Sequence, residues 1–106
     1  MIYELRTYSC KLGTVQRQIA FYRAHGMAIQ TRHLGQPVVF GAQEFGDVNS
    51  YVHIWQFASL ADRDQKRAAL QQDPDWQGFL KKSAEVDYLT AQHSTILTAP
   101  DFMLPG

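Results

Sequence analysis

Polar and apolar side chains alternate along the first residues of the chain, and this alternation predicts a β-strand over Ile2–Ser9. Successive side chains of a strand point to opposite faces, so Glu4 and Arg6 share one face. Two opposite charges on one face of a strand lie either in solvent or along the wall of a cavity. The pattern of the later strands favours the cavity.

Apolar positions recur at helical spacing over residues 15–34. We expect Thr14 to cap this helix and Gly35 to end it. Gly26 lies in the middle, where a helix either tolerates a glycine at a cost of roughly 1 kcal/mol or bends.

A second helical region is expected after Ser59, which is a suitable cap, and Asp73 with Pro74 starts a further segment of it. Strands are predicted at residues 38–45, 51–57 and 86–97, with a hairpin loop at 46–50 and an apolar tail at 99–106. This order of elements, with short loops and right-handed crossovers, predicts an α+β, ferredoxin-like βαββαβ fold. Its antiparallel sheet carries the helices on one face. The length of 106 residues gives room for one domain, so we assign residues 1–106 to a single domain with the tail 99–106.

The predicted strand at residues 51–57 places four rings on one face, and these are Tyr51, His53, Trp55 and Phe57. Val52 and Ile54 occupy the other face and suit packing under helices, so we expect the rings on the uncovered face. An exposed aromatic patch of this kind marks an interface or a pocket. We therefore expect a homodimer in which two sheets close face to face into an α–β barrel. Its lumen would contain Glu4, Arg6, His53 and Trp55.

Composition narrows the functional classes. Ten basic and ten acidic residues give zero net charge, whereas binding to nucleic acid or to an anionic membrane surface requires a basic stripe. The single Cys10 excludes an internal disulfide and fits a reducing compartment. The first residues lack the pattern of a signal peptide, and no apolar run is long enough to span a membrane. We expect a cytoplasmic protein that binds neither nucleic acid nor membrane.

Several segments together resemble one protein family. They are Met1–Tyr8, Arg32–Gly35, Val52–Trp55, Ser59–Arg63, Arg67–Leu70 and Asp73–Trp76. In this order, and over nearly the whole chain, they are similar to the NIPSNAP family. The resemblance implies the dimeric α–β barrel superfamily, which includes small monooxygenases acting on aromatic polyketides, haem-handling enzymes and muconolactone isomerase-like proteins. It carries over no catalytic residue, because fold analogy alone does not assign an activity.

Glu4, Arg6 and His53 form the candidate catalytic group, because the first and third strands are neighbours in this fold. The carboxylate would be the general base, Arg6 would hold an anionic or enolate oxygen, and His53 would move a proton. The alternative is structural: a buried Glu4–Arg6 pair across the dimer, with His53 hydrogen-bonded in the core. The candidate ligand-binding residues are Tyr8, Tyr51, Trp55 and Phe57, whose alternative role is packing at the dimer seam.

The four histidines show no HxH or HExxH spacing, and phosphate loops and nucleophile elbows are absent from the sequence. We therefore expect neither a metal nor another cofactor. Arg63, Lys66 and Arg67 are expected to form a solvated helix face. The sequence thus predicts a homodimeric barrel that binds a small apolar or aromatic ligand and acts on it as a cofactor-independent oxygenase or isomerase. The alternative is a non-catalytic interaction protein whose barrel only holds the dimer together.

Overall fold

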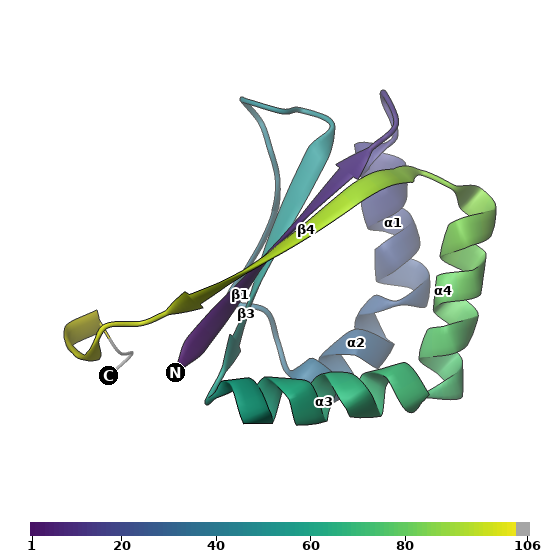
Figure 1. The fold of residues 1–106 in the computed structure, drawn as a ribbon. Helices are drawn as coiled ribbons and strands as arrows, with labels where there is room; N and C mark the ends of the chain where they lie inside the picture. The colour runs from purple at the N-terminus through teal and green to yellow at the C-terminus, as the bar shows by residue number, and fades with distance from the viewer. Residues whose placement is uncertain (104–106) are drawn as a thin grey trace.

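The structure, a computed structural model, describes residues 1–103 and has the predicted order of elements (Figure 1). Each of the two predicted helical regions consists of two helices. The elements are β1 (Ile2–Cys10), α1 (Val15–His25), α2 (Met27–Leu34), β2 (Val39–Ala42), β3 (Ser50–Phe57), α3 (Leu60–Gln72), α4 (Pro74–Val86), β4 (Leu89–Thr98) and the 3-10 turn η1 (Asp101–Met103). Within residues 1–103, no helix combines the length and the apolarity needed to cross a membrane.

The four strands form one antiparallel sheet in the order β2-β3-β1-β4. The first and third strands are therefore neighbours, as predicted, and the arrangement is ferredoxin-like. All four helices lie on one side of this sheet (Figure 1). The predicted α+β, ferredoxin-like fold is confirmed.

Two of the predicted strands are shorter than expected, because the last residues predicted for β2 and the first residues predicted for β4 lie in turns, loops or the end of a helix. β2 stops at Ala42, and the chain then enters the hairpin loop, where Gly46 has a φ of 88°. β4 begins only at Leu89, because α4 continues to Val86 and Asp87 then turns the chain with a left-handed φ of 55°.

Two of the three predicted helix caps are confirmed. Ser59 Oγ accepts a hydrogen bond from the backbone N–H of Asp62 at 3.0 Å, and Asp73 Oδ1 accepts one from Asp75 at 2.9 Å. Thr14 also precedes its helix, but its hydroxyl donates to a backbone carbonyl three residues earlier instead of capping α1. The start of α1 therefore lacks a side-chain cap.

Gly26 separates α1 from α2, because the ring of Phe79 in α4 occupies the space beside it. A Cβ atom on residue 26 would lie 2.7 Å from Cε1 of Phe79. Only a residue without a side chain leaves room for this ring, which belongs to the core. Of the two predicted outcomes, tolerance or a bend, the structure shows a break between two helices of different direction (Figure 1).

The rings of β3 pack against the helices of their own chain, so their predicted position on the uncovered face is wrong. Tyr51, His53, Trp55 and Phe57 are each at most 3% exposed. Trp55 and Phe57 share a core cluster with Leu70 of α3. The reason is volume: large rings fill the deep space between one sheet and the layer of helices, whereas Val52 and Ile54 are too small to fill it.

In β1 too, the side chains predicted on the uncovered face lie on the face that the helices cover. The residues predicted to line the lumen of a dimeric barrel therefore face the helices of their own chain, and these are Glu4, Arg6, His53 and Trp55. The uncovered face of the sheet carries the remaining strand side chains. They include Tyr3, Leu5, Thr7, Val39, Val52, Ile54, Gln56, His93, Thr95 and Leu97. This face has aliphatic side chains at its centre and, within residues 1–103, its strands contribute no Lys, Arg, Asp or Glu to it.

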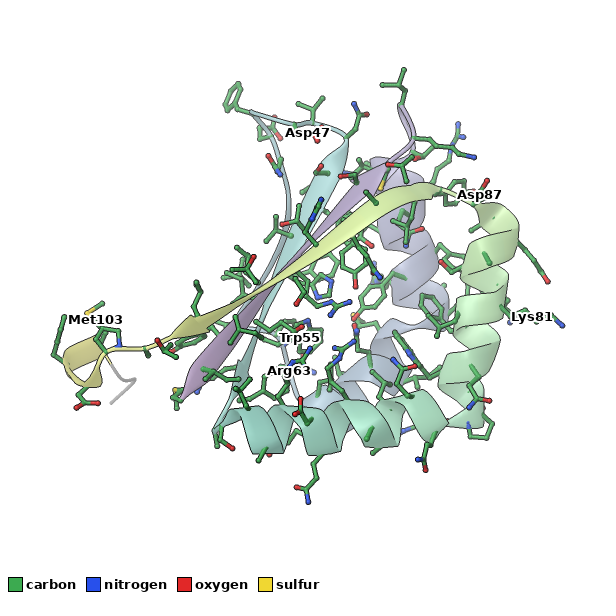
Figure 2. The ribbon with its side chains drawn as sticks, viewed as in Figure 1. Asp47, Trp55, Arg63, Lys81, Asp87 and Met103 are labelled. Carbon is green, nitrogen blue, oxygen red and sulfur yellow. The ribbon has the colours of Figure 1, made fainter. Side chains whose placement is uncertain are left out.

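The end of β4 and η1 extend away from the helices, and Met103 lies at the far end of this extension (Figures 1 and 2). Phe102 and Met103 are exposed. Of the predicted tail, residues 104–106 lie outside the described residues.

Replacing Gly26 by alanine should destabilise the fold by about 1–3 kcal/mol, because the added methyl group overlaps the ring of Phe79. Gly78→Ala is the matched control, since no atom lies within 4 Å of a Cβ built at this position of α4. There alanine should stabilise by up to about 1 kcal/mol through its higher helix propensity. Urea unfolding followed by tryptophan fluorescence measures both variants. Stabilisation by both substitutions would contradict the close contact at Gly26.

Candidate functional site

A cavity of about 240 Å³ lies between the sheet and the helices, and we call it the inner cavity. Its volume is close to the lower end of the range of ligand pockets, roughly 300–1,000 Å³. The side chains that line it include Arg6, Tyr8, Tyr22, Phe40, His53, Arg67 and Trp76. They come from three strands and three helices, so only the folded chain brings them together.

Glu4 of β1 is fully buried next to this cavity. Its Oε2 accepts hydrogen bonds from Arg6 Nη1 at 3.0 Å, Arg63 Nη2 at 3.0 Å and Ser94 Oγ at 2.5 Å. Its Oε1 accepts from Arg63 Nε at 3.2 Å, and Arg67 Nη1 stands 3.8 Å away. Three guanidinium groups from β1 and α3 therefore surround one carboxylate.

The surroundings of Glu4 hold it in the ionised form. Burial by itself would raise its pKa, but the hydrogen bonds from Arg63 and Ser94 and the charges of Arg67 and Arg6 outweigh burial. Together they lower the pKa of Glu4 from 4.5 to about 2. The carboxylate is thus a constant negative charge at neutral pH and a weak proton acceptor.

The prediction that Arg63, Lys66 and Arg67 form a solvated helix face is wrong. Lys66 is half-buried as well: its Nζ lies 5.8 Å from the centroid of the Phe57 ring and pairs with Asp62, one turn earlier, at 3.1 Å. Figure 2 shows Arg63 in the space between α3 and the sheet, beside Trp55. The signal for this lies in the spacing: residues 63, 67 and 70 are four and three apart, so they share a helix face. Leu70 is fully buried, so both arginines occupy the inner face as well.

His53 of β3 lies directly opposite Arg6 of β1. Trp55 Nε1 donates a hydrogen bond to His53 Nδ1 at 2.5 Å, which places the proton of the neutral ring on Nε2. Burial, followed by the charges of Arg6 and Arg67, lowers the pKa of His53 from 6.5 to about 3. The imidazole is therefore uncharged at neutral pH, with Nε2–H as its donor.

Flat rings form the apolar part of the cavity wall. Tyr8 stacks on Tyr51, with 5.1 Å between ring centroids and 7° between planes, and on His53, with 5.0 Å and 11°. Phe40 of β2 stacks on His53 at 5.4 Å and on Tyr22 at 5.5 Å. Because neighbouring rings are in contact, they form one continuous wall, and a planar molecule in the cavity would pack against this wall and not between its rings.

The structure brings four of the seven predicted site residues to the inner cavity, and these are Arg6, Tyr8, Tyr51 and His53. Glu4 bonds Arg6 within one chain, and Trp55 and Phe57 belong to the core. Sequence reasoning missed Arg63, Arg67 and Ser94 as partners of Glu4. Within residues 1–103, no three His, Cys, Asp or Glu side chains come together where they could hold a metal ion.

The model of the NIPSNAP family matches residues 3–103, that is, nearly the whole chain. The chain belongs to the NIPSNAP family. The resemblance found in the sequence is therefore confirmed. A NipSnap homologue from Dictyostelium discoideum is 32% identical over 92 residues, which are 86% of this chain and 40% of that protein. The NIPSNAP chain described here thus spans less than half the length of this relative.

Solved structures agree with the family. A crystal structure of an Agrobacterium tumefaciens protein matches this NIPSNAP chain with a TM-score of 0.88 and 38% identity, and covers 96% of both chains. An antibiotic biosynthesis monooxygenase matches with a TM-score of 0.60 and 13% identity, and covers 94% of this chain and 99% of that one. The second likeness shows a shared fold only.

Glu4→Gln should destabilise the protein at pH 7 by roughly 3 kcal/mol, because it leaves three buried or half-buried arginines without their anion. The difference should shrink as pH falls from 4.5 towards 2, because wild-type Glu4 then takes up a proton and loses the stability that its low pKa contributes. With allowance for screening by solvent, we expect that loss to be of order 2 kcal/mol.

Urea unfolding of both proteins at pH 7 and pH 3 measures the change. Glu44→Gln is the control, because Glu44 is exposed and its replacement should alter stability by less than about 0.5 kcal/mol. A difference between wild type and Glu4→Gln that stays constant across this pH range would contradict the assigned ionisation of Glu4.

Proposed function

We propose that this NIPSNAP-family protein binds a small aromatic compound in the inner cavity of each chain. The observation that supports it is a cavity of about 240 Å³ with polar atoms that have no partner among the described residues. These atoms are Gln18 Oε1, Arg67 Nη1 and Trp76 Nε1. Protein interiors are closely packed and their buried polar groups are almost always hydrogen-bonded. A ligand in the cavity would fill the empty space and would give these three polar atoms hydrogen-bond partners.

For catalysis in this cavity, we propose the reaction of a cofactor-independent oxygenase or isomerase. Neutral His53 would donate its Nε2–H to a carbonyl or enolate oxygen, and the nearby guanidinium of Arg6 would stabilise negative charge there. The low pKa of Glu4 favours a positioning role for this carboxylate over the role of general base. Glu4 orients Arg6 through the hydrogen bond of 3.0 Å that Arg6 Nη1 donates to Glu4 Oε2.

We also propose a homodimer, formed through the uncovered face of the sheet. Leu5, Ile54 and Val39 form a row across three strands in the middle of that face. An antiparallel sheet with one face in water normally carries polar side chains there, whereas this face has aliphatic side chains at its centre and, among the described residues, no formal charge; its polar side chains include Thr7, Gln56 and Thr95. A second copy offers the same apolar surface, and two such surfaces complement each other around a twofold axis.

The uncovered face also supports the alternative function, that of an interaction protein whose sheets only hold a dimer together. The two functions differ in the inner cavity, which the interaction protein would leave unused. For either function we propose a cytoplasmic location, which the lone and buried Cys10 supports.

Filling the inner cavity with a large side chain should weaken ligand binding. Ser83 of α4 lines the cavity and is partly exposed, so Ser83→Trp should place an indole in the space that the ligand needs. Titration of wild-type protein with 2-naphthoate or 2-naphthamide should quench the fluorescence of Trp76, which lines the same cavity. The substitution should weaken the affinity at least about tenfold, which corresponds to about 1.4 kcal/mol.

Lys82→Trp is the matched control, because Lys82 is exposed, adjacent in sequence and not part of the cavity wall. It should bind like wild type. Equal affinity of Ser83→Trp and Lys82→Trp would place binding elsewhere, and quenching by neither compound would argue for the interaction protein.

Ile54→Arg should convert a dimer into a monomer, because it places a charge in the centre of the apolar face, where the partner would desolvate it. Ala84→Arg, on the exposed side of α4, should leave the dimer intact. Native mass spectrometry, with light scattering in solution, gives the mass of each protein. A monomeric wild type would disprove the dimer, and a dimeric Ile54→Arg variant would disprove its formation through the uncovered face.

A further inference from the structure

The charges around the inner cavity do not balance. Among the described residues that line it, two carry formal charge, and both are arginines, Arg6 and Arg67; no Asp or Glu is among them. His53 adds no charge, because burial and the two arginines keep its pKa near 3. The wall of the cavity is therefore positive.

Glu4 does not cancel this charge. Its two oxygens already accept four hydrogen bonds, from Arg6, from Ser94 and twice from Arg63. One carboxylate is thus shared among three guanidinium groups. Within residues 1–103, only Arg63 of these three arginines forms an ion pair with a further carboxylate, that of the exposed Asp64 at 2.9 Å.

Arg67 is the guanidinium that gains least from Glu4. Its Nη1 stands 3.8 Å from Glu4 Oε1, which is beyond hydrogen-bond distance, and has no hydrogen-bond partner among the described residues. Its side chain is only 15% exposed, so solvent compensates it poorly. A buried charge that lacks a hydrogen-bonded counter-ion is costly, and a negatively charged group in the adjacent cavity would supply one.

The rest of the cavity selects the shape of that ligand. The rings of Tyr8, His53 and Phe40 stack on one another and form one continuous aromatic wall, against which a planar molecule can pack. Trp76 Nε1 and Gln18 Oε1 provide a donor and an acceptor without partners in the described chain. A volume of about 240 Å³ restricts the ligand to one or two fused rings with few substituents.

We propose that the inner cavity is a site for a small planar organic acid, whose anionic oxygen accepts hydrogen bonds from the guanidinium of Arg67 while its ring packs against the aromatic wall. This inference rests on the proposed function and makes it narrower, because it assigns the sign of the ligand's charge and the residue that recognises it. Arg67 is then a ligand-binding residue, and Glu4 is the residue that positions Arg6 at the cavity wall.

Matched pairs of probes test the charge separately from the cavity. Isothermal titration at pH 7 compares 2-naphthoate with 2-naphthamide and benzoate with benzamide, since each pair differs in charge and hardly in shape. Wild-type protein should bind each acid at least about tenfold more tightly than its amide, because hydrogen bonds to a charged group contribute more than neutral ones. Inorganic phosphate should bind far more weakly than 2-naphthoate, because it lacks the planar apolar part.

Arg67→Met should remove this preference, so that acid and amide bind within about threefold of each other, and Arg67→Lys should retain part of it. Lys66→Met is the control, because it removes a positive charge from the same helix at a position outside the cavity wall. Circular dichroism verifies that each variant is folded.

The outcomes separate the two proposals. Equal binding of acid and amide to the wild type would overturn the assigned charge and leave the aromatic cavity in place. Binding of neither would overturn both this inference and the proposed function. A loss of preference in Lys66→Met as large as in Arg67→Met would overturn the role of Arg67, and phosphate binding as tight as that of 2-naphthoate would overturn the planar acid.

Discussion

The fully buried carboxylate of Glu4 is the interaction on which the arrangement of this protein depends. It connects three elements, because its partners are Arg6 of β1, Arg63 and Arg67 of α3, and Ser94 of β4. A charge inside a protein is tolerated only with charged or hydrogen-bonded partners, so the position of α3 against the sheet is tied to this one residue. The same requirement brings positive charge to the edge of the cavity. A structural demand therefore creates the chemistry of the site.

The cavity itself results from how the sheet and the helices fill the space between them. β3 contributes large rings to the inner face, and Trp55 and Phe57 pack so completely that they are at most 1% exposed. Closer to the other end of the strand, Tyr51 and His53 stack with Tyr8 and leave the space that Arg67 and Trp76 enclose from the helices. One end of β3 thus belongs to the hydrophobic core, and its other end forms part of the cavity wall.

The two faces of the sheet have separate tasks in this picture. The inner face is polar in its centre and aromatic around it, and it is covered by the chain's own helices. The outer face is aliphatic at its centre and, among the described residues, lacks formal charge, which fits the proposed second copy of the chain. Membership of the NIPSNAP family and the likeness to solved structures fit the fold and leave the chemistry of the cavity to be decided by its residues.

The sequence by itself determined the order of elements, the sheet topology and the caps at Ser59 and Asp73. It also determined the grouping of Glu4, Arg6 and His53. Periodicity, turn residues and strand alternation are local properties, so they can be recognised without the tertiary structure. It could not determine which face of the sheet the helices cover, since alternation separates two faces without saying which is inside. Only the tertiary structure decided that, by fitting the rings of β3 into the deep helix-covered space and the smaller Val52 and Ile54 outside it. It also turned Arg63 and Arg67 inward, because the buried charge of Glu4 lies 59 residues away from Arg63 in sequence and becomes a neighbour only after folding.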